Sequence, residues 1–374
     1  MNGRTTTSSA AKGDARQPLL CPPALLVEHC SAVLVGRGLS KTDAEIVARS
    51  LVHTNLRGVD SHGVTRMQIY VDRLERGLVN PKPQISITHD KGGTLLFDGD
   101  NGMGAVVTSQ ALDVALDRIE AHGSVTVGIR NSNHYGAGAF YAERAAQHDA
   151  VAFLYSNAPS TMALWGGVEP YLGTNPYTFA APAGSCPPII LDMATSVVAR
   201  GKIILAAESG DSIPPGWAID KDGVETTDAQ EALDGSVLPF GGPKGYGIAL
   251  MVDMMAGIMT GAAFGPRIGD LYRNMDQPQN VGVFMQLVHA GAFQPVEAFK
   301  RSMDDMIKEI KTSRTAPGVD EVLVPGEIEA ASAAERSSAG VPLPLDLVHQ
   351  LDELAPPETP SLAVALGLKT ISAD

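Results

Sequence analysis

The sequence is poor in cysteine, in aromatic residues and in long apolar runs, and each shortage excludes a class of protein. Only three cysteines occur in 374 residues, Cys21, Cys30 and Cys186, and their spacing fits neither a disulfide framework nor a zinc cluster. We therefore expect the reducing cytoplasm as the location. No apolar run approaches the roughly 18 residues that a membrane-spanning helix needs, so no membrane partner is expected.

Positive charge is also scarce. Lysine and arginine number 28 against 42 aspartate and glutamate, which gives a formal net charge of −14. Such a surface repels phosphate backbones, so a nucleic-acid partner is not expected. If an acidic protein acts on an anionic small molecule, its few cations must be placed next to that molecule. An arginine close to a histidine is therefore of interest.

What the sequence does contain is typical of an α/β enzyme. Hydrophobic residues make up 44%, and the 39 glycines are spread between apolar runs. Apolar residues at helical spacing predict helices between residues 25 and 80, one of which begins at Ser61. Short β-rich runs separated by helices follow Pro81, and 248–259, apolar almost all round, predicts a fully buried helix. The pattern is helical again beyond Pro295.

These patterns predict three parts. Residues 1–22 are expected to form a disordered tail, and 81–294 an α/β core that binds cofactor and substrate. Residues 23–80 and 295–374 are expected to pack together as one helical dimerisation lobe, with 356–374 loosely held. No GxGxxG fingerprint is present, so a Rossmann fold is not predicted.

The first candidate site is the segment RGVDSHGVTR, residues 57–66. If a helix begins at Ser61, His62 lies in its first turn and Arg66 lies one turn later on the same face. The guanidinium of Arg66 can bind a carboxylate through two parallel hydrogen bonds. Ser61 can orient the imidazole, which titrates near neutrality as an acid–base group must. The alternative interpretation is a capped surface helix with an ordinary ion-pairing arginine.

Further candidates are turns rich in glycine. The segment NSNHYGAG, residues 131–138, joins a predicted strand to a helix, and its glycines would let a phosphate or a ring approach the backbone. In GGPKGYG, residues 241–247, Lys244 at a helix N-terminus could hold a phosphate, although the order of a P-loop is missing. Both segments can equally be read as tight turns, with a satisfied histidine or a solvated lysine.

In series, the blocks RGVDSHGVTR, NSNHYGAG, LGTNP, LDMATS, ARGK, GGPKGYG and QPQNVG resemble the malate/L-lactate dehydrogenase family that is unrelated to the Rossmann-type enzymes. The resemblance runs from about Leu25 to Ala355. It implies an α/β/α core with a mixed sheet, a helical lobe, a homodimer, and NAD or NADP bound without a GxGxxG loop. It also implies an NAD(P)-dependent dehydrogenase of small 2-hydroxy acids.

The resemblance also implies roles for single residues. Ser61 and His62 correspond to the acid–base couple and Arg66 to the arginine that binds the substrate carboxylate. Thr174 and Arg200 correspond to substrate-pocket positions. The expected cofactor contacts are His134, Tyr135, Gly136, Ala137, Gly138, Asp192, Met193, Ala194, Lys244, Gly245, Pro325, Gly326 and Glu327.

Several alternatives stay open at this point. Some relatives use the histidine at position 134 as the proton acceptor, so both histidines are catalytic candidates. Lys202 is counted with the catalytic residues because it stands where imine-reducing relatives carry an acid beside the catalytic pair. A lysine in place of that acid favours a hydroxy-acid dehydrogenase over a cyclic imine reductase. A metal hydrolase using His62, Asp60 and His134 has no ligand spacing in its favour, and no metal is expected. An inactive binding protein is the remaining alternative.

Overall fold

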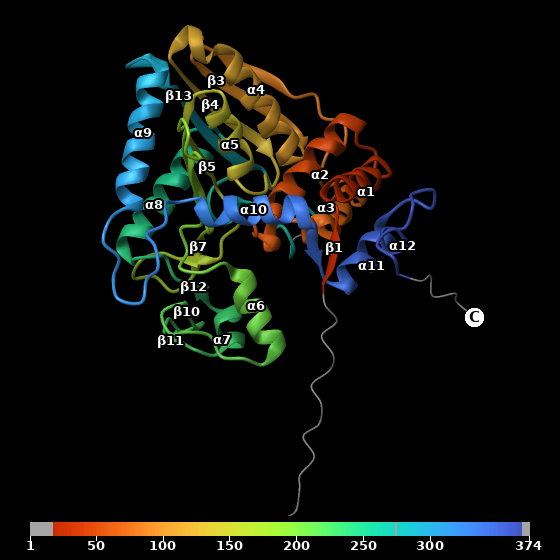
Figure 1. Ribbon diagram of the computed structural model, residues 1–374. Helices are drawn as coiled ribbons and strands as arrows, with labels where there is room; N and C mark the ends of the chain where they lie inside the picture. Colours follow the sequence, from red (N-terminus) through yellow and green to blue (C-terminus); the bar gives the residue numbers. More distant parts are fainter. Residues whose placement is uncertain (1–17, 274, 369–374) are drawn as a thin grey trace, which may run out of the picture.

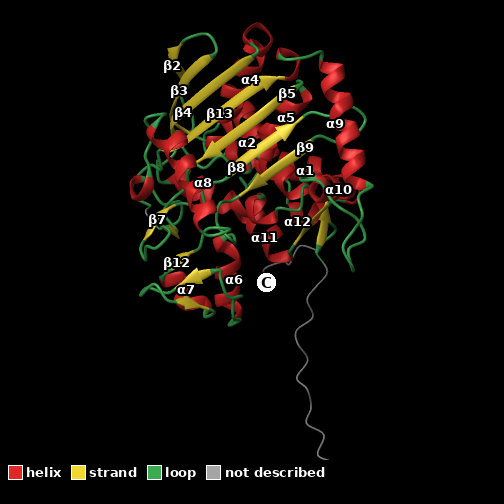
Figure 2. Ribbon diagram, turned by 90° about the vertical axis from the view of Figure 1, so that its left-hand side faces the viewer, coloured by secondary structure: helices red, strands yellow, loops and turns green. Residues whose placement is uncertain are grey.

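A seven-stranded mixed sheet forms the centre of the computed structural model, which describes residues 18–273 and 275–368. Figure 2 shows its strands side by side across the upper part of the molecule. The strands in spatial order are β2 (Ser86–Asp90), β3 (Thr94–Gly102), β4 (Ser124–Ser132), β13 (Val281–His289), β5 (Ala150–Ser156), β8 (Tyr177–Ala181) and β9 (Ile189–Met193). Only β3 and β4 run parallel, and the other neighbouring pairs are antiparallel.

Helices cover both faces of this sheet. On one face, α4 (Gly104–His122) and α5 (Ala139–Gln147) pack against the odd-numbered residues of β4 and β13. Side chains alternate along a strand, so the even-numbered residues face the other way. There, α8 (Pro243–Asp253) and the π-helical turn Met254–Ile258 approach so closely that a Cβ at Gly282 would lie 1.8 Å from the Ala256 carbonyl oxygen. The result is the expected α/β/α core.

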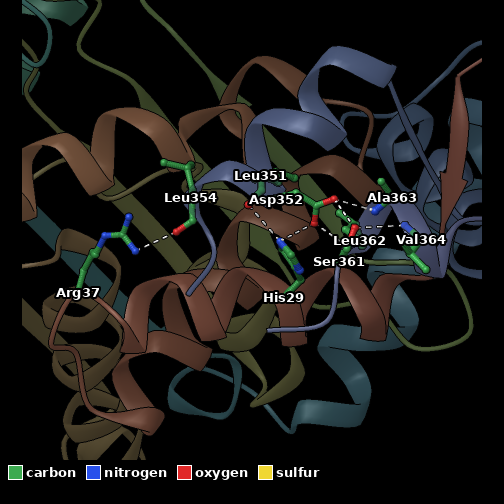
Figure 3. A network of polar contacts seen from close by, with 9 residues as sticks. All are labelled: His29, Arg37, Leu351, Asp352, Leu354, Ser361, Leu362, Ala363 and Val364. Carbon is green, nitrogen blue, oxygen red and sulfur yellow. Dashed lines mark hydrogen bonds and ion pairs between the residues drawn. The ribbon is translucent and has the colours of Figure 1, made fainter. Parts of the chain in front are cut away.

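Helices from the two ends of the described chain pack together in one helical lobe. Its helices are α1 (Pro23–Val35), α2 (Lys41–Leu56), α3 (Met67–Glu75), α11 (Leu345–Leu354) and α12 (Leu362–Ala365), which share a buried apolar cluster. Figure 3 shows polar contacts that join them: the His29 ring on α1 lies 3.1 Å from the Leu351 carbonyl oxygen, and Arg37 donates to the Leu354 carbonyl at 2.8 Å. The division of the chain into domains near 81 and 294 stays a prediction.

A smaller lobe lies below the main sheet in Figure 1. Its five-stranded sheet has the order β11 (Glu225–Thr226), β10 (Ala218–Ile219), β12 (Ser236–Val237), β6 (Met162–Ala163) and β7 (Pro170–Leu172). Helices α6 (Arg200–Ser209) and α7 (Ala229–Asp234) pack beside it around Ile203 and Ala232.

Two further helices connect these parts. α9 (Val296–Lys311) lies on the opposite side of the molecule from α1 in Figure 1, although it directly follows Pro295. Asp304 fixes it there by accepting the backbone N–H groups of Gly184, Ser185 and Cys186. α10 (Glu327–Ala339) crosses α2 on its way back to the helical lobe.

Two sequence predictions about the ends of the chain are wrong. Within the predicted tail, Leu19–Cys21 forms strand β1 and pairs with β14 (Val341–Leu343); residues 1–17 lie outside the described residues. The segment after Pro356 is not loose as far as residue 368, because the Asp352 carboxylate accepts the Leu362 and Ala363 N–H groups (Figure 3). Residues 369–374 are not described.

The segment 248–259 is not a fully buried helix. Met254, Ile258 and Met259 keep 46%, 56% and 66% of their surface exposed, because only one face of the helix packs on the sheet. The apolar sequence on all sides of the helix therefore predicted more burial than the structure shows.

Candidate active site

Residues 57–66, the first candidate segment, do not form the α-helix that the spacing predicted. Two 3₁₀ turns, Asp60–His62 and Val64–Arg66, precede α3, and between them Gly63 has non-helical φ and ψ of −88° and −149°. Asn55 of α2 imposes this break, because its side-chain oxygen accepts the Val64 N–H at 2.8 Å. A Cβ at Gly63 would lie 2.1 Å from that oxygen. Ser61 therefore does not begin an α-helix.

The turn brings Ser61 and His62 into the expected contact. The Ser61 hydroxyl lies 3.1 Å from Nδ1 of His62. Asp60 points elsewhere: its carboxylate accepts hydrogen bonds from the Asn55 amide and from Arg336 of α10, both at 2.7 Å. Asp60 is thus engaged in holding the turn, and the contacts do not favour the metal-ligand role of the hydrolase alternative.

The fold brings the second histidine next to the first. The rings of His62 and His134 have centroids 5.9 Å apart, although 72 positions separate the two residues in the sequence. Nδ1 of His134 lies 2.7 Å from the hydroxyl of Tyr70 on α3. In both rings a hydroxyl group engages Nδ1, which leaves Nε2 as the nitrogen available to a substrate.

Arg66 lies beside the two imidazoles, with its guanidinium 5.5 Å from the centre of the Tyr272 ring. It forms no ion pair within the described part of the chain, and its buried Nε has no hydrogen-bond partner there. Tyr272 comes from the loop between α8 and β13. Buried Arg73 of α3 holds that loop by donating to the backbone carbonyls of Asp270, Leu271 and Gln277.

The charge of Arg66 and partial burial determine the protonation of the pair. Burial first, and then Arg66, lower the pKa of His62 from its ordinary 6.5 to about 4. Burial, Arg66 and His62 lower the pKa of His134 well below the ordinary value. Burial raises the pKa of Tyr70, so its hydroxyl keeps its proton. At neutral pH both imidazoles are therefore neutral and able to accept a proton.

A cavity of about 240 Å³ is lined by Val59 and Ala137, which lie three positions along the chain from His62 and His134 respectively. Among the predicted cofactor contacts, Ala137, Asp192, Pro325 and Gly326 line it. Gly136 and Gly326 have positive φ angles of 84° and 90°, and a Cβ at Gly326 would lie 2.7 Å from the Ile190 carbonyl oxygen, so the backbone shape here requires glycine. The Glu327 carboxylate is engaged by Lys311 and by the Val324 N–H, and the acid of α10 that lines the cavity is Glu329 instead.

The other residues predicted to contact the cofactor do not line the cavity, and their contacts within the described chain are as follows. Tyr135 is buried and stacks on Tyr141, and a Cβ at Gly138 would collide with the Thr178 hydroxyl at 1.9 Å. Met193 and Ala194 follow Asp192 at the end of β9. Lys244 is exposed in the first turn of α8, where Gly245 lies against the Phe240 carbonyl oxygen.

The residues predicted to bind the substrate make their contacts elsewhere in the fold. The Thr174 carbonyl accepts from Thr195, and Arg200 at the start of α6 donates to the Leu233 carbonyl at 2.8 Å. Lys202 is exposed on α6. No described contact joins Thr174, Arg200 or Lys202 to the two histidines. The roles of all these residues stay predictions.

Four residues that shape the site were not singled out from the sequence: Asn55, Arg73, Tyr272 and Gln279. The buried Gln279 side chain accepts the His134 N–H at 3.1 Å. Gln279 lies in the block QPQNVG that carried the resemblance, which was the available signal. Tyr70 was likewise given no role in the site from the sequence.

The malate/L-lactate dehydrogenase family model matches residues 22–352. The chain belongs to this family. It is 39% identical over 322 residues to L-sulfolactate dehydrogenase of Methanocaldococcus jannaschii, covering 86% of this chain and 92% of that protein. Malate dehydrogenase of Pyrococcus abyssi is 38% identical over 331 residues, with 86% and 90% covered.

Solved structures of the family have the same fold. Sulfolactate dehydrogenase from Methanocaldococcus jannaschii superimposes with a TM-score of 0.84 at 37% identity, covering 94% of this chain and 98% of that one. Curated relatives include dehydrogenases named for NAD(+) and for NADP(+). As a member of this family, the protein is an oxidoreductase that acts on the CH–OH group of a hydroxy acid.

Proposed function

We propose that the protein transfers a hydride between a nicotinamide cofactor, NAD or NADP, and a small 2-oxo or 2-hydroxy acid of the malate/lactate type. One observation carries the proposal. The guanidinium of Arg66, without an ion-pair partner in the described chain, lies beside two imidazoles whose Nε2 atoms are free. A carboxylate and the adjacent C2 oxygen of a 2-hydroxy acid match such an arrangement of a cation and a proton acceptor.

In this proposal Arg66 binds the substrate carboxylate and so orients C2 and its oxygen towards the histidines. His62 is the acid–base group: its neutral Nε2 accepts the hydroxyl proton during oxidation and returns it during reduction. Ser61 fixes the orientation of that ring through Nδ1. Tyr70 does the same for His134, the second candidate for the proton transfer.

The cavity beside the histidines fits the cofactor. Its apolar walls include Ile328, which is 64% exposed and so available to cover a ring, and its floor is the glycine-containing turn that begins α5. When the dinucleotide is bound, its nicotinamide supplies or accepts the hydride. Ala137, Asp192, Pro325 and Gly326 would hold the dinucleotide.

The test is a substrate panel. Pyruvate, oxaloacetate, 3-sulfopyruvate and a cyclic imine carboxylate are offered with NADH and with NADPH, and loss of the reduced-nicotinamide absorbance is followed. We expect turnover of at least one 2-oxo acid, unchanged by EDTA. Turnover of the imine alone would make the protein a cyclic imine reductase. Absence of turnover with every substrate, together with absence of nucleotide binding, would contradict the proposal.

A further inference from the structure

The cavity described above is mostly apolar and is too small for a whole dinucleotide. Thirteen residues line it, and most of its walls are apolar, among them Val59, Ile190 and Ile328. The volume of about 240 Å³ lies below the roughly 300–1,000 Å³ of pockets that enclose a whole small molecule, so the cavity suits one half of a dinucleotide.

The position of the cavity indicates which half. Two segments of the chain carry both the catalytic histidines and the cavity wall: residues 57–62 include Arg57, Val59 and His62, and residues 134–139 include His134 and Ala137. Three residues of extended chain span at most about 10 Å, which is within the reach of a dinucleotide. If the nicotinamide lies at the histidines, as the proposed function requires, the cavity receives the adenosine.

The charged residues of the cavity wall are two acids and one arginine. Among the described lining residues, Arg57 is the only cation. It is 7% exposed, and its guanidinium lies 3.7 Å from the Glu143 carboxylate. Glu143 is itself hydrogen-bonded to the His53 ring at 2.8 Å. Arg57 is therefore already paired within the protein.

The two acids are placed differently. Asp192 accepts the Thr178 hydroxyl at 2.7 Å and the Ala139 N–H at 2.9 Å, one on each oxygen. Each carboxylate oxygen can accept a second hydrogen bond, so Asp192 retains acceptor sites for a ribose hydroxyl. Glu329, half-buried in the first turn of α10, has no hydrogen bond or ion pair within the described residues.

We infer that the cavity accepts the free 2′-hydroxyl of NAD and rejects the 2′-phosphate of NADP, with Asp192 and Glu329 as the discriminating groups. A carboxylate that accepts a ribose hydroxyl favours NAD, whereas a phosphate monoester carrying about −1.5 to −2 charges is repelled by the same carboxylate. Among the described residues that line the cavity, no unpaired cation compensates for this repulsion. This inference rests on the proposed function, because it requires a nicotinamide dinucleotide.

The experiment measures binding rather than turnover. NADH and NADPH are titrated separately into the protein without substrate, by calorimetry at low salt. We expect the Kd for NADPH to exceed that for NADH at least tenfold. Glu329→Gln should reduce this ratio at least threefold, chiefly by tightening NADPH, and Glu329→Lys should reduce it further. Glu335→Gln, on an exposed position of the same helix, is the matched control and should leave the ratio unchanged.

The possible results separate the two levels of the argument. A wild-type ratio near one, or a preference for NADPH, overturns the inference and leaves the proposed function intact. So does a ratio that Glu329→Gln does not change, since Glu329 would then have no part in the discrimination. If neither dinucleotide binds, the proposed function fails and the inference fails with it.

Discussion

The lowered pKa of His62 leads to a prediction that pH–rate profiles can check. An ordinary histidine with a pKa of 6.5 would be about nine-tenths protonated at pH 5.5, and oxidation of a hydroxy acid would then be about tenfold slower than at pH 8. With a pKa of about 4, the His62 imidazole keeps almost all of its base form at pH 5.5. We therefore expect kcat/KM for oxidation to be flat between pH 8 and 5.5.

The reverse reaction requires the protonated ring, which becomes rarer as pH rises above 4. Between pH 5.5 and 8, kcat/KM for reduction should fall about tenfold per pH unit, because this parameter reports the ionisation of the free enzyme. His62→Gln should slow reduction at least about tenfold and remove the slope, while calorimetric binding of the dinucleotide stays normal.

Two results would refute this reasoning. A break in the oxidation profile near pH 6.5 would mean that neither partial burial nor Arg66 perturbs the catalytic group. Normal turnover in His62→Gln, with the slope abolished in His134→Gln and the cofactor still bound, would make His134 the proton donor. Tyr70→Phe provides a control, because it removes the hydroxyl that contacts Nδ1 of His134 and leaves the Ser61 contact to His62 in place.

Four shorter predictions follow from the same contacts. Arg66→Lys keeps the charge but loses the planar fork, so kcat/KM should fall for carboxylate substrates while dinucleotide affinity stays close to normal; a loss of dinucleotide affinity would assign the arginine to the cofactor. Asn55→Ala leaves the Val64 N–H unpaired and should lower the free energy of unfolding by about 1–3 kcal/mol in urea titrations. At 25 °C, kcat should fall by more than the small unfolded fraction alone would account for. Because the pKa of His62 is lower in the folded than in the unfolded protein, the unfolded state binds more protons between pH 6.5 and 4, and stability should fall by about 1–3 kcal/mol as pH decreases through that range; His62→Gln should reduce this dependence. Light scattering should give a homodimer, twice the chain mass of 39.1 kDa, and a stable monomer at micromolar concentration would contradict it.

The sequence predicted the elements of the core well because each depends on local periodicity. The short β-rich runs expected after Pro81 include 125–129, which lies within β4, and Leu112 and Ile119 of α4 pack on the sheet. Burial was predicted less well. The segment 248–259 is apolar on all sides, and nothing in its own sequence indicates that the core has room for only one of its faces.

The candidate site was predictable only in part, since its geometry depends on contacts between distant segments. Arg66 and the two histidines could be named from motifs, but spacing alone cannot bring His62 and His134 to a ring distance of 5.9 Å. The α-helix predicted at Ser61 was wrong because Asn55, six positions earlier, accepts the Val64 N–H and packs against Gly63, whose φ and ψ are non-helical. The position of Tyr272 could not be predicted from local sequence, because Arg73, 199 residues before it, determines where its loop lies.

The way in which Arg73 holds that loop also affects how this enzyme can change over evolution. Three of the bonds that its guanidinium donates go to main-chain oxygens, which every amino acid provides. Substitutions at exposed positions such as Tyr272 therefore leave the anchor intact while altering the wall beside Arg66. A family that acts on several hydroxy acids can diversify at this loop, and a library randomised at 272 and 273 is a practical starting point for engineering new substrates.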